Sequence, residues 1–244
     1  MTALERAINS ALDANGTMGG FFDRIGTSKN RGFVIVTYEM IARELDRALR
    51  FGDLEAVNSA LQLMDVTLGK QVLDFLQEAS DAGVEEAKYQ LDLYQIKGAE
   101  GVNLSEQVNS AAYAVLSRVK AQGDLIRAMV LTGAESEQIL GTEDAPGVLR
   151  WSDITRQLAY FTAAMFWGAF SVEIDITLPA GQTLFRKQAV AVLDNRTTDC
   201  CKQVNGQVQN LNDPFVLTGE PRFADKMDWP GFHWHCRTGV ALVG

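Results

Sequence analysis

The chain has 244 residues, of which 47% are apolar and 22% charged, and its formal net charge is −9 at pH 7. This composition is typical of a folded protein with one large core or two smaller ones. Nucleic-acid binding needs a basic patch that neutralises the backbone phosphates, and this acidic chain has no basic run. We therefore expect weak or no direct nucleic-acid binding. The longest uncharged stretch, residues 157–172, is shorter than a membrane span, and the first residues lack a signal-peptide pattern. We therefore expect no secretion and no membrane association.

Apolar residues recur at helical spacing from the start of the chain to about residue 170. The pattern is clearest after Asp53, which is placed to cap a long helix. Seven apolar side chains follow three or four residues apart, at Leu54, Val57, Leu61, Met64, Leu68, Val72 and Phe75. Ser80, Asp81 and Gly83 predict a break before a second helical stretch that ends at residues 97–98.

Four further helices are predicted, at residues 37–50, 105–121, 123–132 and 150–170. Asn103 and Ser105 are candidate caps for the second of these four. The last is rich in aromatic residues, which indicates a buried helix, and Gly168 within it would allow a neighbouring helix to approach closely.

The periodicity changes to two-residue alternation after residue 170. The runs "VEIDITLP" (172–179) and "KQAVAVLD" (187–194) predict strands. Residues 143–151 contain a Pro-Gly pair and are the best candidate linker. We therefore predict an α+β protein with a mainly helical N-terminal region, residues 1–146, and a small α+β C-terminal domain with a Cys/His cluster, residues 147–244.

Every cysteine and histidine of the chain falls in one C-terminal window, at Cys200, Cys201, His233, His235 and Cys236. Thiolate and imidazole are the donors that zinc prefers, so this clustering predicts a metal site. An odd number of cysteines, two of them adjacent, argues against a disulfide framework. A single disulfide from Cys236 to one of the adjacent pair is the alternative.

Local spacing selects three of these residues as the main ligands of a structural zinc ion. Thr197 is placed to cap a short helical turn, and Cys201 would lie near its N-terminus, where the positive end of the helix favours thiolate. His233 and Cys236 are separated by two residues, so both side chains of a tight knuckle can reach one ion. The fourth ligand stays open among Cys200, His235, Asp194 and Asp199. Cys200 is also compatible with a small buried side chain, and His235 with a surface residue.

The same region resembles the C-terminal domain of the phage Mu F-like minor head proteins, also called phage head morphogenesis proteins. In that family an acidic-x-Arg-Thr stretch leads to a Cys and, five residues on, a Gly, and a later Pro-rich turn gives His-x-x-Cys-Arg. The matching positions are Asp194, Arg196, Thr197, Cys201, Gly206, Pro230, His233, Cys236 and Arg237. The resemblance covers about the last 60 residues. It departs from the family at Gly231, where a second proline is common, and at Thr238, where many members have another cysteine.

The resemblance implies a structural minor head protein of a tailed bacteriophage. Such a protein would act in head morphogenesis, DNA packaging or ejection, and it would lie in the virion capsid after synthesis in the host cytoplasm. Its partners would be the portal protein, the major capsid protein, or both.

Two other classes of function are compatible with the same residues. A metal-dependent hydrolase or nuclease needs an open coordination position and a general base, and Asp194, Asp199 and Glu220 are the available carboxylates. None of them lies in a known catalytic motif, so we predict no enzyme and no catalytic residues. The third class is an interaction module anchored on aromatic residues 229, 232 and 234, although such rings more often close a small core beside a metal knuckle.

Overall fold

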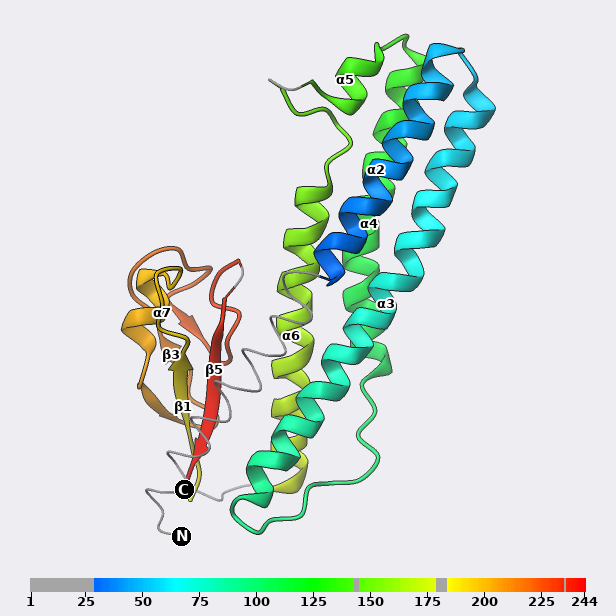
Figure 1. The fold of residues 1–244 in the computed structure, drawn as a ribbon. Coiled ribbons are helices and arrows are strands. Elements are labelled where there is room, and N and C mark those ends of the chain that lie inside the picture. The colour runs from blue at the N-terminus through cyan, green and yellow to red at the C-terminus, as the bar shows by residue number, and fades with distance from the viewer. Residues whose placement is uncertain (1–28, 143–144, 179–183, 235) are drawn as a thin grey trace.

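A computed structural model describes residues 29–142, 145–178, 184–234 and 236–244. Long helices form an elongated bundle, and a small region of strands lies against one side of it (Figure 1). The helices of the bundle are α2 (Lys29–Arg50), α3 (Leu54–Asp92), α4 (Ser105–Leu131), α5 (Ser136–Leu140) and α6 (Trp151–Thr177). The predicted fold class is confirmed, because a mainly helical region precedes a small region with antiparallel strands and the Cys/His cluster.

Helix α3 begins where the sequence predicts and continues through the predicted break. Asp53 caps it by accepting a hydrogen bond from the Ala56 backbone N–H at 3.0 Å. The predicted break near Gly83 is wrong, because Gly83 lies inside the helix and is buried against α6. A Cβ atom there would lie only 2.1 Å from the Phe166 carbonyl oxygen. Gly83 therefore permits close contact between two helices, whereas Gly168, predicted for that role, has open space around it.

Several predicted boundaries in the helical region also shift. The predicted helices at 105–121 and 123–132 form the single helix α4, because Gly123 continues the helix instead of ending it. The Asn103 carboxamide accepts from the Ser105 backbone N–H but does not cap α4, whose N-cap is Leu104. Helix α3 ends at Asp92, before the predicted residues 97–98, and the short helix α5 was not predicted.

The strand predicted at residues 172–179 is wrong, because residues 172–177 are the last turns of α6. Its alternation of apolar residues is misleading, since Ile174 is buried and Ile176 is exposed. Glu173 is also buried, and its carboxylate accepts a hydrogen bond from the Ala99 backbone N–H at 2.6 Å. That contact fixes the end of α6 to the segment that follows α3.

The described residues of the C-terminal region, 184–234 and 236–244, form one short helix and two small sheets. Its elements are β1 (Arg186–Ala191), α7 (Asp199–Val204), β2 (Val208–Asn210), β3 (Phe215–Val216), β4 (Lys226–Met227) and β5 (Thr238–Val243). One sheet has the order β2-β1-β5 and the other pairs β3 with β4, and all pairings are antiparallel. The strand predicted within residues 187–194 is confirmed as β1.

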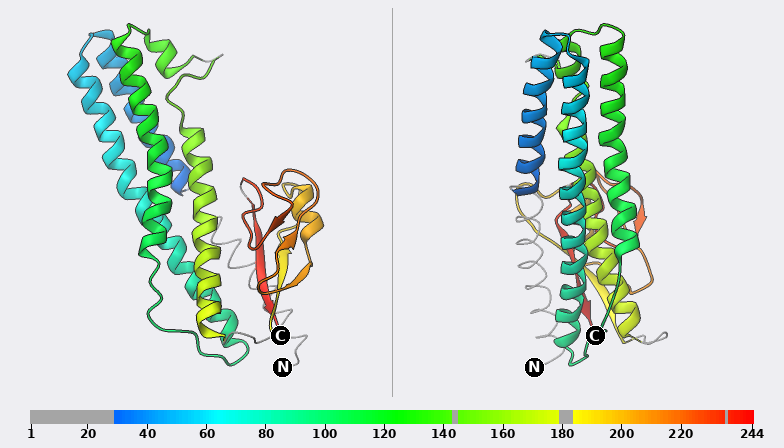
Figure 2. Two further views of the ribbon diagram at one scale, coloured as in Figure 1. Left: turned by 180° about the vertical axis from the view of Figure 1, so that it is seen from behind. Right: turned by 90° about the vertical axis from the view of Figure 1, so that its right-hand side faces the viewer.

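Two clusters of buried side chains divide the interior. One lies between α2, α4, the first half of α3 and the start of α6. The other joins the ends of α3 and α6 to the C-terminal region, and it includes Trp167, Phe170, Phe215 and Phe232. Figure 2 shows the strands beside α6 when the molecule is viewed from behind. The predicted division of the chain at residue 146 stays a prediction.

Strand β5 is an edge strand, and side chains from the end of α3 and from the segment just after it satisfy its free edge. The Gln90 carboxamide donates to the Val240 carbonyl at 2.9 Å and accepts from the Leu242 N–H at 2.8 Å. The Tyr94 hydroxyl donates to the Leu242 carbonyl at 2.9 Å. Because buried backbone groups need partners, these contacts fix β5, which follows Cys236 almost directly, against the bundle. Among the described residues, none of the helices has the length and apolar composition of a membrane span.

Candidate metal centre

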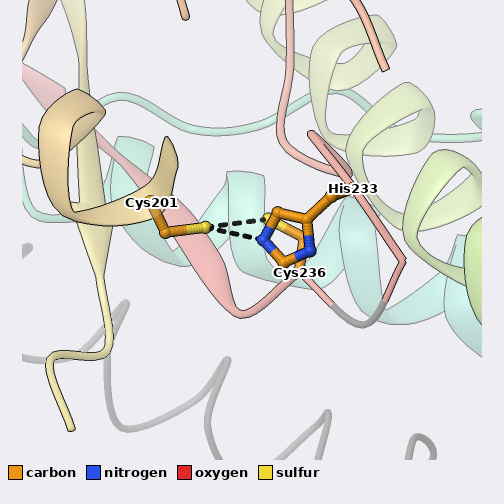
Figure 3. A group of neighbouring side chains, drawn as sticks. All are labelled: Cys201, His233 and Cys236. Atoms are coloured by element: carbon orange, nitrogen blue, oxygen red, sulfur yellow. Dashed lines mark hydrogen bonds between the residues drawn. The ribbon is translucent and has the colours of Figure 1, made fainter. Parts of the chain in front are cut away.

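Cys201, His233 and Cys236 come together in the C-terminal region, as Figure 3 shows. Cys201 belongs to α7, and the other two belong to the segment between β4 and β5. One donor atom from each residue lies within 4.8 Å of the other two, and all three side chains are buried. The structure thus places the three main predicted ligands around one point.

The donor set has the chemistry and spacing of a zinc site. The Cys201 Sγ atom lies 2.9 Å from His233 Nε2 and 3.8 Å from Cys236 Sγ. Donors about 2.0–2.3 Å from a tetrahedral zinc ion lie roughly 3.5–3.8 Å from one another. The sulfur–sulfur distance agrees with that spacing, and a slight outward movement of the imidazole would bring the nitrogen into the same range. Two thiols and one imidazole therefore fit a zinc ion.

Helix α7 and the knuckle orient the donor atoms before any ion binds. Thr198, and not the predicted Thr197, is the N-cap of α7, and its side chain accepts from the Cys201 N–H. The hydroxyl of Thr198 also lies 2.9 Å from His233 Nε2. On the other side of the ring, Nδ1 lies 2.7 Å from the Trp234 carbonyl oxygen. A proton on Nδ1 makes this contact a hydrogen bond and leaves Nε2 free to bind a metal.

Cys201 and His233 together stabilise the thiolate form of Cys236. Burial opposes the thiolate of Cys236, but hydrogen bonds from Cys201 and His233 outweigh it and hold the pKa of Cys236 well below its usual value. The hydrogen bond to Cys236 and burial raise the pKa of Cys201. Burial lowers the pKa of His233, but the contacts with Cys236 and the hydrogen bond to the Trp234 backbone together outweigh burial and raise it. This arrangement favours negative charge on sulfur where a cation would bind.

Asp194 fixes the residue that follows Cys236. Its two carboxylate oxygens accept from Arg237 at 2.6 and 2.8 Å, a bidentate pair that joins the turn before α7 to the segment that carries His233 and Cys236. The hydrogen bond from Arg237 holds the pKa of Asp194 well below its usual range. Asp199 lies 3.6 Å from Lys202 at the surface. The structure groups neither carboxylate with the three donors.

The remaining candidate ligands are placed differently. Cys200 is fully buried in the core shared by α3, α6 and the C-terminal region, and burial raises its pKa to about 11. It is not part of the three-residue group. His235 lies outside the described residues. All three cysteines are free thiols, so the alternative disulfide is not formed here. A small cavity of about 10 Å³, lined in part by Thr198, Thr238 and Arg196, adjoins Cys201 and His233.

Lys187 anchors the segment that carries His233 and Cys236. It lies on β1, is fully buried, and donates from Nζ to the Asp228 carbonyl at 2.7 Å. Its ammonium also lies 4.4 Å from the ring centre of Trp229 and 5.3 Å from that of Phe215. These are distances of favourable cation–π contact. A buried charge at this position therefore holds the chain just before the knuckle.

The pKa of Lys187 provides a testable prediction. Burial lowers this pKa to about 8, and Asp228 offsets only part of the effect. At Lys187 the unfolded chain then binds more protons than the folded chain between about pH 8 and 10, so the contribution of this residue to the free energy of unfolding rises with pH in that window. The slope is at most about 1.4 kcal/mol per pH unit. Urea unfolding across this range should show that the free energy of unfolding of the wild type rises relative to that of Lys187→Met, and parallel curves would contradict it.

The sequence did not indicate two contributors to this site. Thr198 is one residue from the predicted cap, because Thr197 is used in the Asp194 turn, where it accepts from the Asp194 N–H and donates to the Val192 carbonyl. Lys187 resembles an ordinary surface lysine in the sequence, and only the folded structure surrounds it with aromatic rings. Its position in an alternating apolar strand was the one available signal.

Fold and site together define a helical-bundle protein with a small C-terminal region that presents two thiols and an imidazole. Residues 29–108 match the family model described as the Cdc37 C-terminal domain. This match covers about a third of the chain, and it comprises α2, α3, the following loop and the first turn of α4. No curated protein and no solved structure matches the chain.

The family match contradicts the identification of the chain as a phage Mu F-like minor head protein. The predicted role in phage head morphogenesis, the virion location, and the portal and capsid partners are therefore wrong. The reason lies in what the C-terminal motif encodes. A Cys followed later by His-x-x-Cys is a local arrangement for metal binding, and local chemistry recurs on unrelated folds. The nine matching positions near the C-terminus therefore indicate a kind of site, and they do not identify the family of the whole chain.

Proposed function

We propose that this chain is a non-catalytic, co-chaperone-type protein whose α2–α3 hairpin binds other proteins. The observation that carries the proposal is the coincidence of two features in one segment. Residues 29–108 match a Cdc37 C-terminal domain, a domain of a co-chaperone. The same segment presents large apolar side chains to solvent on the side of α3 that faces away from the core.

The exposed apolar stripe, defined here as Leu63, Val66 and Leu73, follows helical geometry. Leu63, Val66 and Leu73 have 44%, 65% and 39% of their surface exposed. At about 100° per residue they share one face of α3, opposite the buried residues Leu61, Leu68 and Val72. A row of apolar side chains on a rigid helix is the kind of surface that another protein can bind.

The second part of the proposal is a structural zinc ion held by Cys201, His233 and Cys236. Bound zinc would link α7 to the segment between β4 and β5 and so stabilise a region whose sheets are short. The buried donors and the Thr198 and Trp234 contacts support this role. In this proposal the thiolates and the imidazole would act as ligands, and no described residue near them is arranged as a general base, which supports a structural site over catalysis.

The test of the proposed function is a binding experiment with two probes, an Hsp90-class chaperone and a protein kinase catalytic domain, which Cdc37 domains bind. The full chain should form a complex with at least one of them in sedimentation or pull-down assays. Val66→Asp/Leu73→Asp should weaken it at least about tenfold, because two desolvated apolar contacts would be lost. The matched control is Tyr113→Asp/Leu131→Asp, two apolar positions outside residues 29–108 that are more exposed than Val66 and Leu73.

The control variant should bind as the wild type does. Absence of a complex with either probe, or equal weakening by both double variants, would refute the proposed function. Circular dichroism should show the same helix content in all three proteins, since every substituted side chain is exposed.

A further inference from the structure

A groove of about 500 Å³ lies between α4 and the start of α6. The α4 residues in its wall fall at helical positions i, i+3, i+4 and i+7, so they form one face of that helix. Trp234, which directly follows the proposed ligand His233, brings the C-terminal region into the same wall. The lining residues are Arg118, Ala121, Gln122, Leu125, Val148, Arg150, Asp153, Arg156, Gln157 and Trp234.

The charge of this groove is opposite to that of the chain as a whole. It is lined by three arginines and one aspartate, whereas the chain has a formal net charge of −9. Arg118 and Arg156 are exposed, and neither forms an ion pair with another described residue. Two guanidinium groups are therefore available to carboxylates or other anions.

The groove wall is held in place by hydrogen bonds that are already made. Gln122 donates to the Arg150 carbonyl at 3.0 Å and accepts from the Tyr38 hydroxyl at 2.9 Å. Arg150 donates from Nε to the Gly147 carbonyl at 2.7 Å. These contacts connect α2, α4 and the segment before α6, so a ligand would meet a formed surface and lose little free energy in ordering it.

The N-terminus of α6 adds positive potential to the same place. Arg150 is its N-cap and provides no side-chain capping bond. The first N–H groups of a helix lack intrahelical partners, and the helix dipole places partial positive charge there. Asp153 and Arg156, on the first turns of α6, line the groove, so this end of the helix borders it.

Apolar surface lies beside the positive charge. Leu125 and Trp234 are 50% and 41% exposed. Edge-to-face contacts with Tyr160 and Phe223, at centroid distances of 5.8 and 4.9 Å, hold the Trp234 ring. A ring that is fixed on one side and open on the other is a suitable anchor for an apolar side chain.

We infer that this groove binds an acidic segment of a partner protein. Carboxylates of that segment would contact Arg118 and Arg156, and an apolar side chain would pack on Trp234 and Leu125. A nucleic acid fits less well, because its phosphates extend beyond the groove into the field of a strongly acidic chain. The groove is separate from the exposed apolar stripe on α3. The proposal for the groove therefore does not depend on whether that stripe binds a chaperone or a kinase.

The test uses fluorescence anisotropy with the full chain at physiological salt. The probe is a short fluorescein-labelled peptide of Asp and Glu residues with a central pair of Leu, and a second peptide has Asn and Gln in place of the acids. The acidic peptide should bind at least about tenfold more tightly than the neutral one. Arg118→Glu/Arg156→Glu should lose about tenfold or more in affinity. Arg43→Glu/Arg47→Glu makes the same change in net charge on α2, away from the groove, and should bind as the wild type.

A single-stranded oligodeoxynucleotide with the same label separates the two kinds of polyanion. Equal or tighter binding of the oligonucleotide would overturn the proposal in favour of nucleic acid. Equal loss in both double variants would also overturn it, because the long-range field and not the groove would then control binding. The milder variant Arg118→Ala/Arg156→Ala should also bind the acidic peptide more weakly than the wild type, by a smaller factor. Failure of the wild type to bind the acidic peptide would refute the site.

Discussion

Substitution of Cys236 by Ser is expected to abolish stoichiometric zinc binding and to loosen the C-terminal region. Serine removes one of two thiolates from a site with three grouped protein donors. Loss of an outer contact to a ligand already costs 10–100-fold in metal affinity, so loss of the ligand itself should cost at least about 100-fold. Zinc content measured after dialysis should fall from about one ion per chain to nearly none.

The same change should expose residues 184–244 to protease. Structural zinc contributes on the order of 10 kcal/mol in small zinc domains, so loss of one ligand should lower the stability of this region by at least about 3 kcal/mol. The core formed by α2, α4 and the first half of α3 does not include the C-terminal region and should stay protected. Limited proteolysis with mass spectrometry would locate the cuts.

Cys200→Ala is the matched control for this experiment. Cys200 is the neighbour of a proposed ligand and is equally buried, but it belongs to the hydrophobic core and not to the grouped donors. This variant should keep its zinc while losing some core stability. Loss of zinc in Cys200→Ala to the same degree, or full retention of zinc in Cys236→Ser, would show that the assigned ligand set is incorrect.

The features that sequence predicts well are those with local causes. Asp53 and the regular apolar spacing after it mark the start of α3, because capping and one-sided burial act within a few residues. Cys201, His233 and Cys236 are predictable as a group because sulfur and imidazole donors are rare in this chain and occur at ligand spacing. The zinc ion itself, and the absence of catalysis, stay predictions.

The features that sequence did not predict have causes far away in the chain. The alternation at residues 172–177 fits a strand or a helix equally, and contacts of Glu173 and Ile174 with distant segments select the helix. Lys187 becomes a buried anchor only because Trp229 and Phe215 surround it. The family interpretation was wrong for a related reason, since a short motif describes its own metal chemistry and not the helices that precede it.

Gly83 shows the same limitation and provides the second prediction, which concerns the packing of α3 on α6. Gly83→Ala should lower the free energy of unfolding by about 3 kcal/mol. The added methyl would lie 2.1 Å from the Phe166 carbonyl oxygen and 2.9 Å from its carbon. A backbone carbonyl cannot rotate away as a side chain can, so the two helices must separate and disrupt the packing of their neighbours, including Ala169.

Gly69→Ala makes the same chemical change in the same helix and should have the opposite effect. No atom lies within 4 Å of a Cβ built at Gly69, so the substitution adds helix propensity without a clash. It should raise the free energy of unfolding by about 0.5–1 kcal/mol. Urea unfolding of the two variants compares these values directly. If Gly83→Ala were also stabilising, α3 and α6 could not approach as closely at Gly83 as the structure shows. The contact between Gly83 and the Phe166 backbone would then be wrongly placed.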